Sequence, residues 1–351
     1  MNTCKNSHIK SVKFSDFMQE WLYGKDGYYS SYKEIGKKGD FFTAVSASSF
    51  FGGTIANRLI KSIKEGFLPK DTTVLEIGAH RGYLLADMIQ FIYTLDEDLF
   101  DSLNFSILEP RVELHKAQKE YFKNSFGDRV ELQIFRSFEE ISLSSSFVVA
   151  NEIFDAFACE VVKEGDMLYM EEFEPFFAKQ DDYTKSICER YGIKKGEVVK
   201  GYEDFAVQMD KSIDRFEFVT FDYGDKEIRD DFSLRIYDKH KVYPFFSLTR
   251  FAEDAKLTKE KSLRSLYKLS DITYDVNFSH LMDSFSNVGI KAISYMTQLK
   301  ALVEFGLLDL LEMLKDNSTQ ENYLRELNRA KYLIDPSFMG ERFKCVVFRK
   351  G

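Results

Sequence analysis

The chain has 351 residues and a formal net charge of −9, with 44% hydrophobic and 30% charged residues. This composition is typical of a folded protein with a large core and excludes a disordered chain. The negative charge disfavours nonspecific binding to nucleic acid or anionic membranes. No apolar run is long enough to span a bilayer, so we expect a cytoplasmic protein without membrane insertion.

Cysteine and histidine spacing argues against a metal centre. The four cysteines at positions 4, 159, 188 and 345 are far apart and form no C-x-x-C pair, and the histidines show no H-x-x-x-H spacing. We therefore expect neither a disulfide framework nor a metal site, and a reducing compartment fits this pattern.

The N-terminal part, residues 1–72, predicts helices. In KFSDFMQEWLYG the apolar residues recur at helical spacing, with Ser15 as a candidate N-cap and Gly24 as a stop. A glycine-rich turn follows, and a second helix is expected from Ser49 onward.

Strand and helix patterns alternate over residues 73–156. The runs TVLEIGA, NFSILEP, VELQIF and SSFVVANEIF are short and apolar, and amphipathic stretches follow the first two. Such alternation predicts an α/β fold, in which helices cover both faces of a parallel sheet. Sheets of this kind bind ligands at the carboxyl ends of their strands.

The alternation breaks after residue 156. Residues 157–212 contain EVVKEGDMLYMEEFEPFF, which predicts antiparallel hairpins, followed by a charged stretch and a helix. We interpret this segment as an inserted cap, with an ordinary continuation of the domain as the alternative. Residues 213–351 then return to the core with the buried strand FEFVTFDYGD, additional helices, and candidate last strands in IKAISYMTQ and FKCVVFRK.

The loop EIGAHRG after the first strand has the spacing E-x-G-x-x-x-G. Glu76 ends the strand, Gly78 permits a tight turn, and Gly82 lets the next helix approach closely. Glu109 ends the second strand, where an acid can accept hydrogen bonds from both ribose hydroxyls of a nucleoside. Because the dinucleotide pattern G-x-G-x-x-G is absent, we expect a nucleoside carrying an amino-acid tail, such as S-adenosylmethionine (SAM). A glycine turn without a ligand is the alternative.

Acidic residues also end the later strands. Glu152 and Asp155 are three residues apart and could hold a guanidinium together. The structural alternatives are a helix N-cap for Asp155 and an ion pair for Glu152. Asp222 ends the fifth strand, where it either faces the site or caps the next turn.

Seven segments carry a family resemblance. They are GYYSSYKEIGKKGDFFTAVSASSFFG, VLEIGAHRGYLLADM, NEIFDAF, FVTFDYGD, DITYDVNF, TQLKALVEFG and MGERFK. Their order resembles that of the MidA-like SAM-dependent methyltransferases, which include the mitochondrial arginine methyltransferase needed for respiratory complex I assembly. The resemblance runs from about residue 14 to 348.

The resemblance implies a Rossmann-like class I methyltransferase sheet with an N-terminal helical segment, an inserted α+β cap, and SAM as cofactor. The cofactor-binding positions it implies are Asp40, Thr43, Glu76, Gly78, Gly82, Glu109, Ser137, Phe138 and Asn151. Its catalytic candidates are Glu152, Asp155, Asp222 and His240. The implied partner is a protein substrate, with a complex I-type subunit as one possibility.

The chain departs from the family pattern at several positions. Ala79 and His80 replace the Pro and Gly of the cofactor loop, a Ser-Pro-Glu segment is lost at residues 44–46, and Asp275 is one of three departures in the D-I-T motif. Three functions therefore stay open: a protein arginine methyltransferase, an assembly or interaction protein on a degenerate methyltransferase scaffold, and a small-molecule methyltransferase.

Overall fold

The structure is a computed structural model that describes residues 11–30, 43–251 and 261–351. The chain divides into two compact units, each assembled from segments that are distant in sequence. The core unit comprises Phe42–Phe154, Tyr202–Gly224 and Phe278–Gly351, as far as these are described. The accessory unit comprises Asp155–Gly201 and the described parts of Met1–Phe41 and Asp225–Asn277.

These units differ from the four segments expected from sequence. The last helix of the expected cap, α8 (Tyr202–Ser212), belongs to the core unit. The accessory unit in turn includes residues 225–277, which the sequence pattern placed in the second half of the core. The division into two units follows from contacts between segments that are distant in sequence. Local sequence patterns do not reveal such contacts.

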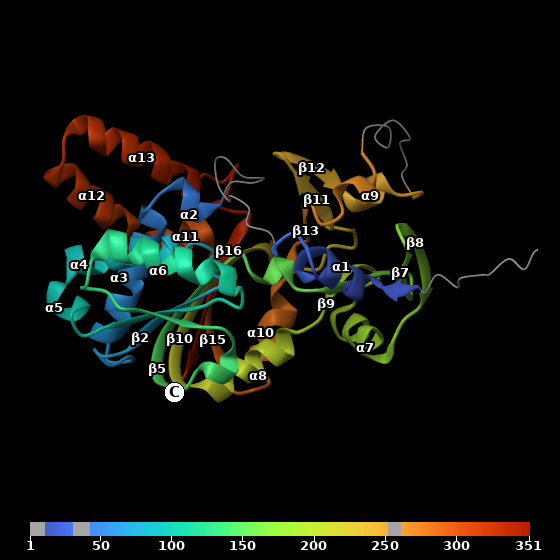
Figure 1. The fold of residues 1–351 in the computed structure, drawn as a ribbon, viewed down its shortest axis with the longest axis horizontal. Coiled ribbons are helices and arrows are strands. Elements are labelled where there is room, and N and C mark those ends of the chain that lie inside the picture. Colours follow the sequence, from blue (N-terminus) through green and yellow to red (C-terminus); the bar gives the residue numbers. More distant parts are fainter. Residues whose placement is uncertain (1–10, 31–42, 252–260) are drawn as a thin grey trace, which may run out of the picture. The chain divides into compact units, whose positions relative to one another are not determined.

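A mainly parallel sheet forms the centre of the core unit (Figure 1). Its strands follow the order β15 (Lys291–Thr297), β16 (Phe343–Lys350), β10 (Ile213–Asp225), β5 (Leu143–Asn151), β2 (Thr73–Ile77), β3 (Asn104–Leu108) and β4 (Leu132–Phe135). Strands β10, β5, β2, β3 and β4 run parallel to one another, whereas β16 is antiparallel to both β10 and β15. The expected α/β fold class is thus confirmed.

Helices connect these strands. The core unit contains α2 (Ala44–Ala47), α3 (Phe50–Lys64), α4 (Tyr83–Leu95), α5 (Glu97–Phe100), α6 (Val112–Phe126), α8, α10 (Phe278–Ser286), α11 (Gln298–Glu304), α12 (Leu307–Asn317) and α13 (Gln320–Ile334). Short 3-10 turns cover Phe138–Glu140 and Phe154–Ala156.

The side chains of β10 show how the sheet is buried on two faces. Phe221 packs edge-on against Phe51 of α3, with ring centroids 4.9 Å apart. Phe218, three residues earlier, instead contacts Phe205 of α8 and Phe285 of α10. Because successive residues of a strand point to opposite faces, one strand contributes to two apolar layers. This double burial explains why FEFVTF reads as a continuous apolar run.

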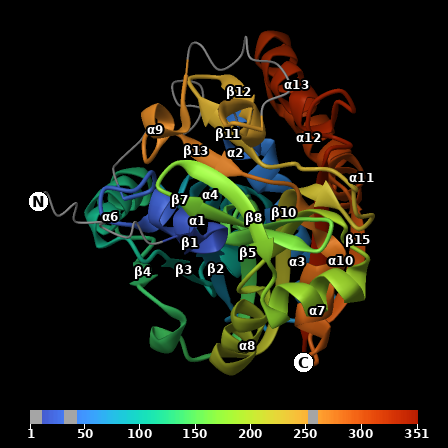
Figure 2. The ribbon, with the colours of Figure 1, turned by 90° about the vertical axis from the view of Figure 1, so that its right-hand side faces the viewer.

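The accessory unit consists of small antiparallel sheets and short helices (Figure 2). Its elements are β1 (Val12–Lys13), α1 (Phe14–Tyr23), β6 (Cys159–Lys163), β7 (Asp166–Glu171), β8 (Glu174–Lys179), α7 (Asp182–Tyr191), β9 (Lys195–Val199), β11 (Arg235–Asp238), β12 (Lys241–Pro244), a 3-10 turn at Phe245–Leu248, α9 (Leu263–Leu266), β13 (Asp271–Thr273) and β14 (Val276–Asn277). Antiparallel pairing of β6 with β7 and of β7 with β8 confirms the expected hairpins.

The expected N-cap of the first helix is wrong by two residues. Helix α1 begins at Phe14 with Lys13 as its N-cap, and that cap makes no side-chain hydrogen bond. The Ser15 hydroxyl instead donates to the buried carboxylate of Glu160 at 2.7 Å. A tertiary partner therefore uses the polar group that local pattern assigned to capping.

A buried carboxylate fastens the amino-terminal half of β10. Glu217 is fully buried and accepts two hydrogen bonds from the Arg58 guanidinium, at 2.7 and 2.9 Å. Arg349 of β16 donates a third at 2.6 Å, and the Ser62 hydroxyl a fourth at 3.1 Å. The cluster joins α3, β10 and β16 through charge-assisted bonds.

We expect Glu217→Gln to lower the free energy of unfolding by about 3 kcal/mol, because it leaves the largely buried Arg58 guanidinium without its counter-charge and Arg349 with only Glu65. Urea denaturation of the purified protein measures this change. The control is Asp101→Asn, which removes an exposed acid paired with Arg129 and should cost less than about 1 kcal/mol. Equal losses in the two variants would contradict the assigned role of Glu217.

Candidate functional site

Parallel register aligns the strand ends of the core sheet. The Gly78 amide donates to the Leu108 carbonyl at 3.1 Å, and the Glu109 amide donates to the Phe135 carbonyl at 2.9 Å. On the other side of β2, the Glu152 amide donates to the Phe221 carbonyl at 2.9 Å. Each of these residues is thus the first beyond its strand, and each is held by the neighbouring strand. The three lie along one carboxyl edge of the sheet, where such folds bind ligands.

The loop after β2 has the geometry that its glycines predict. Gly78 and Gly82 have φ values of +72° and +79°, which glycine adopts without steric cost. A Cβ on Gly82 would lie 2.6 Å from the Phe122 ring, so only glycine lets α4 start this close to α6. The following helix therefore presents its N-terminus to the loop.

Glu76 links the end of β2 to the first turn of α4 through a hydrogen bond. Its carboxylate accepts the Leu85 amide of the first turn of α4 at 3.1 Å. Burial raises the pKa of Glu76 to about 8, against the opposing effect of that amide. The residue is 5% exposed, so in this structure it positions the loop.

His80, which replaces the family glycine, is held in the left-handed region. Its φ is +47°, a conformation that non-glycine residues adopt at a cost of roughly 1–3 kcal/mol. The Gln118 side chain donates to the His80 carbonyl oxygen at 2.7 Å. Gln118 is fully buried on α6, so this bond anchors the loop to a helix.

Glu109 lies where the ribose acid was expected, but its carboxylate already has a partner. It is 1% exposed and bonded to the Arg111 guanidinium through Nε and Nη2, both at 2.8 Å. The His115 ring donates to the Glu109 carbonyl oxygen at 2.7 Å.

Arg111, His115 and Gln118 are site residues that the sequence interpretation missed. They share one face of α6 and its N-cap, at i, i+4 and i+7, and all three contact the loop or the strand end. That helical spacing of polar residues directly after a strand-end acid is the signal that could have found them.

Asn151 and Glu152 follow one another at the end of β5. The Asn151 amide donates to the Glu152 carboxylate at 2.7 Å, while its own buried Oδ1 accepts no hydrogen bond from the described residues. Glu152 has a φ of +53°, which is uncommon for a residue with a side chain. Backbone conformations of this kind concentrate at functional sites.

Of the other catalytic candidates, Asp222 has structural partners, and His240 lies in a turn. Both carboxylate oxygens of the buried Asp222 accept backbone amides at 2.9 Å, from Phe154 and Tyr223. His240 lies in the exposed two-residue turn between β11 and β12, where Lys239 and His240 have φ values of +50° and +65°. A catalytic role for either residue stays a prediction.

Asp155 belongs to the accessory unit, and Glu152 to the core unit. The Asp155 carboxylate accepts a hydrogen bond from the Thr273 hydroxyl at 2.7 Å. This contact links Asp155 to the D-I-T motif within the accessory unit. The expected pairing of the two acids on one guanidinium stays a prediction.

Thr43 and Phe138, two of the remaining cofactor candidates, have partners within the core unit. Thr43 is the N-cap of α2 and forms a capping box with Ser46, so its polar groups are engaged locally. Phe138 is buried and packs edge-on against Phe205, with ring centroids 5.4 Å apart, and Ser137 precedes it. Asp40 lies outside the described residues. Contact of these residues with a cofactor stays a prediction.

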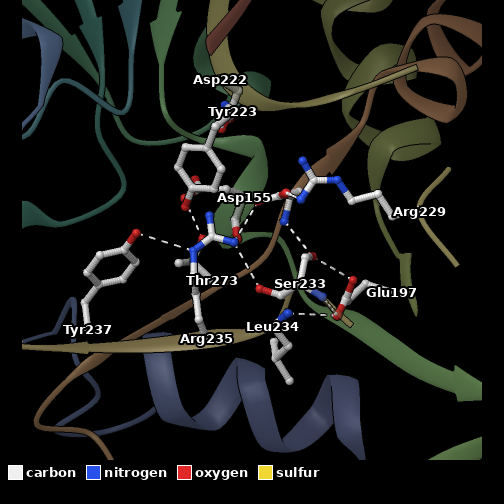
Figure 3. A network of polar contacts seen from close by, with 11 residues as sticks. Asp155, Glu197, Asp222, Tyr223, Arg229, Ser233, Leu234, Arg235, Tyr237 and Thr273 are labelled. Carbon is white, nitrogen blue, oxygen red and sulfur yellow. Dashed lines mark hydrogen bonds and ion pairs between the residues drawn. The ribbon is translucent and has the colours of Figure 1, made fainter. Parts of the chain in front are cut away.

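Part of the polar network drawn in Figure 3 belongs to the accessory unit. The Glu197 carboxylate accepts the Ser233 amide and hydroxyl, at 3.0 and 2.8 Å, and the Leu234 amide at 2.9 Å. Burial raises the pKa of Glu197 to about 7. Asp275, one of the departures in the D-I-T motif, pairs with Arg235 at 2.7 Å and with Arg229 at 3.2 Å. These ion pairs offset the negative charge of Asp275 and link it to Arg235 of β11 and to Arg229.

The comparisons identify the class of protein. A family model described as "Putative S-adenosyl-L-methionine-dependent methyltransferase" matches residues 54–296. Since this is more than half of the chain, the protein belongs to that family of SAM-dependent methyltransferases, and SAM is its cofactor. The resemblance inferred from the seven segments is thereby confirmed.

Two curated relatives align with most of the chain. The protein arginine methyltransferase NDUFAF7 homolog, mitochondrial, of Drosophila melanogaster is 20% identical, over 97% of this chain and 82% of its own length. The protein arginine methyltransferase NDUFAF7, mitochondrial, of Rattus norvegicus is 21% identical, over 95% of this chain and 79% of its own.

Two solved structures from Burkholderia thailandensis share the fold. One, bound to S-adenosyl-homocysteine, has a TM-score of 0.79 at 21% identity and covers 97% of this chain and 88% of its own. The other has a TM-score of 0.76 at 23% identity and covers 97% of this chain and 87% of its own.

Across the described segments, no helix is both long and apolar enough to cross a membrane.

The strand-end residues fit this cofactor. Gly78 is exposed, so its backbone is accessible at the loop. Glu109 would hold ribose hydroxyls through the carboxylate that Arg111 contacts in this structure, and the buried Asn151 Oδ1 would accept from the ammonium group of a methionine tail. Because an unsatisfied buried acceptor is costly, a donor from the ligand would relieve it.

We expect Glu109→Gln to weaken SAM binding by about 2 kcal/mol, since it replaces a charged acceptor of ribose hydroxyls by a neutral one. Isothermal titration calorimetry measures the affinity. The control is Glu113→Gln, an exposed acid in the first turn of the same helix. Unchanged affinity in a folded Glu109→Gln variant would remove Glu109 from the site.

Loss of the hydrogen bond between Gln118 and the His80 carbonyl should also weaken cofactor binding. We expect Gln118→Leu to reduce SAM affinity about fivefold, the value of one net hydrogen bond.

His80→Gly should preserve or tighten SAM binding, because glycine adopts the left-handed conformation freely. Abolished binding in His80→Gly would show instead that the imidazole contacts the ligand.

Proposed function

We propose that the protein transfers a methyl group from SAM to an arginine side chain of a protein substrate. The observation that carries the proposal is the Glu152 carboxylate, which is held at the carboxyl edge of the sheet by a left-handed backbone and by the Asn151 amide. The names of the Drosophila and rat relatives support an arginine acceptor. A respiratory-complex subunit is the first substrate class to test.

An arginine acceptor explains the need for an acid at this position. The guanidinium is charged and its lone pairs are delocalised, so it is a poor nucleophile. The cofactor, when bound, supplies a methyl group on a positively charged sulfur. Glu152 binds the guanidinium, fixes its orientation and offsets its charge as a proton leaves the nitrogen that is methylated.

Asn151 and the sheet hold Glu152 in place. The amide of Asn151 binds one carboxylate oxygen, and the Phe221 carbonyl accepts the Glu152 amide. The carboxylate is therefore oriented before a substrate arrives, which reduces the reorganisation needed during the reaction.

We expect Glu152→Gln to reduce methyl transfer roughly a hundredfold while SAM affinity stays nearly constant, as for the loss of one preorganised electrostatic group. The assay incubates each variant with labelled SAM and cell lysate and locates the label by mass spectrometry.

The matched control is Glu131→Gln, an exposed acid just before β4, at the opposite edge of the sheet. Label on arginine that disappears in Glu152→Gln supports the proposal. Label on lysine, on a carboxylate or on a small metabolite assigns another methyltransferase class. SAM binding without any transfer favours an assembly protein.

A further inference from the structure

The acid assigned to the ribose is closed off by its own neighbour. Glu109 Oε1 accepts the Arg111 Nε at 2.8 Å and the Arg111 backbone amide at 3.2 Å. Oε2 accepts the Arg111 Nη2 at 2.8 Å. The side chain of Glu109 is 2% exposed, while that of Arg111 is 24% exposed. The guanidinium therefore stands between the carboxylate and solvent.

The hydrogen-bonding capacity of the carboxylate makes this a conflict. A carboxylate offers about four lone-pair sites on two oxygens. Arg111 occupies both sites of Oε1 and one of Oε2, which leaves a single free acceptor site. A ribose presents two hydroxyls to this carboxylate, so at least one guanidinium bond must break before both can bind.

We propose that Arg111 is a built-in competitor of the ribose and sets the affinity of the nucleoside site. Its two parallel N–H groups take the places of the two vicinal hydroxyls, with bonds of the length typical for charge-assisted pairs. Binding of the nucleoside exchanges one pair of donors for another, so only part of the binding energy appears as affinity. This inference rests on the ribose role proposed for Glu109.

The local structure allows the exchange without disturbing the strand end. Arg111 is the N-cap of α6 with an extended backbone, so its side chain can rotate toward solvent while the helix stays in place. The Glu109 backbone is held independently, by the Phe135 carbonyl and by the His115 ring. Glu109 therefore keeps its position when the guanidinium leaves.

Two opposite effects of removing the guanidinium distinguish competition from simple support. In Arg111→Met the free protein contains a buried carboxylate without its counter-charge, so its melting temperature should fall. S-adenosylhomocysteine supplies the missing donors, so its affinity should rise at least threefold and its stabilisation of the protein should grow. A residue that only supports the fold would lower both stability and affinity.

The experiment titrates S-adenosylhomocysteine and its 2′,3′-dideoxy analogue into the full chain by calorimetry, with melting temperatures recorded in parallel. In Arg111→Met we expect tighter binding of S-adenosylhomocysteine and unchanged binding of the dideoxy analogue, which has no hydroxyls to replace the guanidinium. Arg111→Lys retains the charge but loses the paired geometry, so its affinity for S-adenosylhomocysteine should lie between that of the unaltered protein and that of Arg111→Met. The same variant replaces Arg111→Met in the test if Arg111→Met does not fold. The control is Arg129→Met, which removes an exposed arginine of the same unit.

Unchanged or weaker binding of S-adenosylhomocysteine in folded Arg111→Met and Arg111→Lys variants overturns the inference. An equal gain for both ligands also overturns it, because the gain would not depend on the hydroxyls. Glu109→Gln separates this failure from a failure of the ribose role itself. If Glu109→Gln binds as the unaltered protein does, the ribose role is lost; if it binds weakly while Arg111→Met shows no gain, only the competition is lost.

Discussion

The register of the parallel strands is the constraint on which the site depends. Ile77 of β2 lies opposite Leu108 of β3 and Ala150 of β5, so these strands end at nearly the same level. Gly78, Glu109 and Asn151 are therefore level at one edge of the sheet, and Glu152 follows one residue further. A shift of one residue in β5 would move Glu152 out of the row and turn its neighbours to the opposite face of the sheet.

The chain stores strain at two positions on that edge. His80 and Glu152 are both non-glycine residues with left-handed backbones, and each has a neighbour that binds it: Gln118 holds the carbonyl of His80, and Asn151 holds the carboxylate of Glu152. The surrounding bonds thus replace the freedom that glycine would have provided. This explains how the loop keeps its shape although the family glycine is missing at position 80.

Local patterns in the sequence predicted the strands of the core, the hairpins and the glycine turn well, because short apolar runs and glycines encode them directly. They could not predict what becomes of a polar group when a tertiary partner competes for it. Ser15 was expected to cap a helix and binds Glu160 instead, and Asp222 accepts two backbone amides. Arg111 was overlooked because its importance lies in its bond to Glu109, and the residue type alone does not reveal that bond.

The position of β16 in the sheet has a consequence for folding. This strand lies between β10 and β15, yet more than a hundred residues separate it from β10 along the chain. Without it, residues 216–223 of the apolar β10 lack their antiparallel partner, and β15 has no partner in the described part of the sheet other than β16. Long-range pairing of this kind is slow, and unpaired apolar edges recruit other chains. Formation of the core sheet therefore depends on a pairing between segments far apart in the sequence, and exposure of the apolar β10 before that pairing favours aggregation.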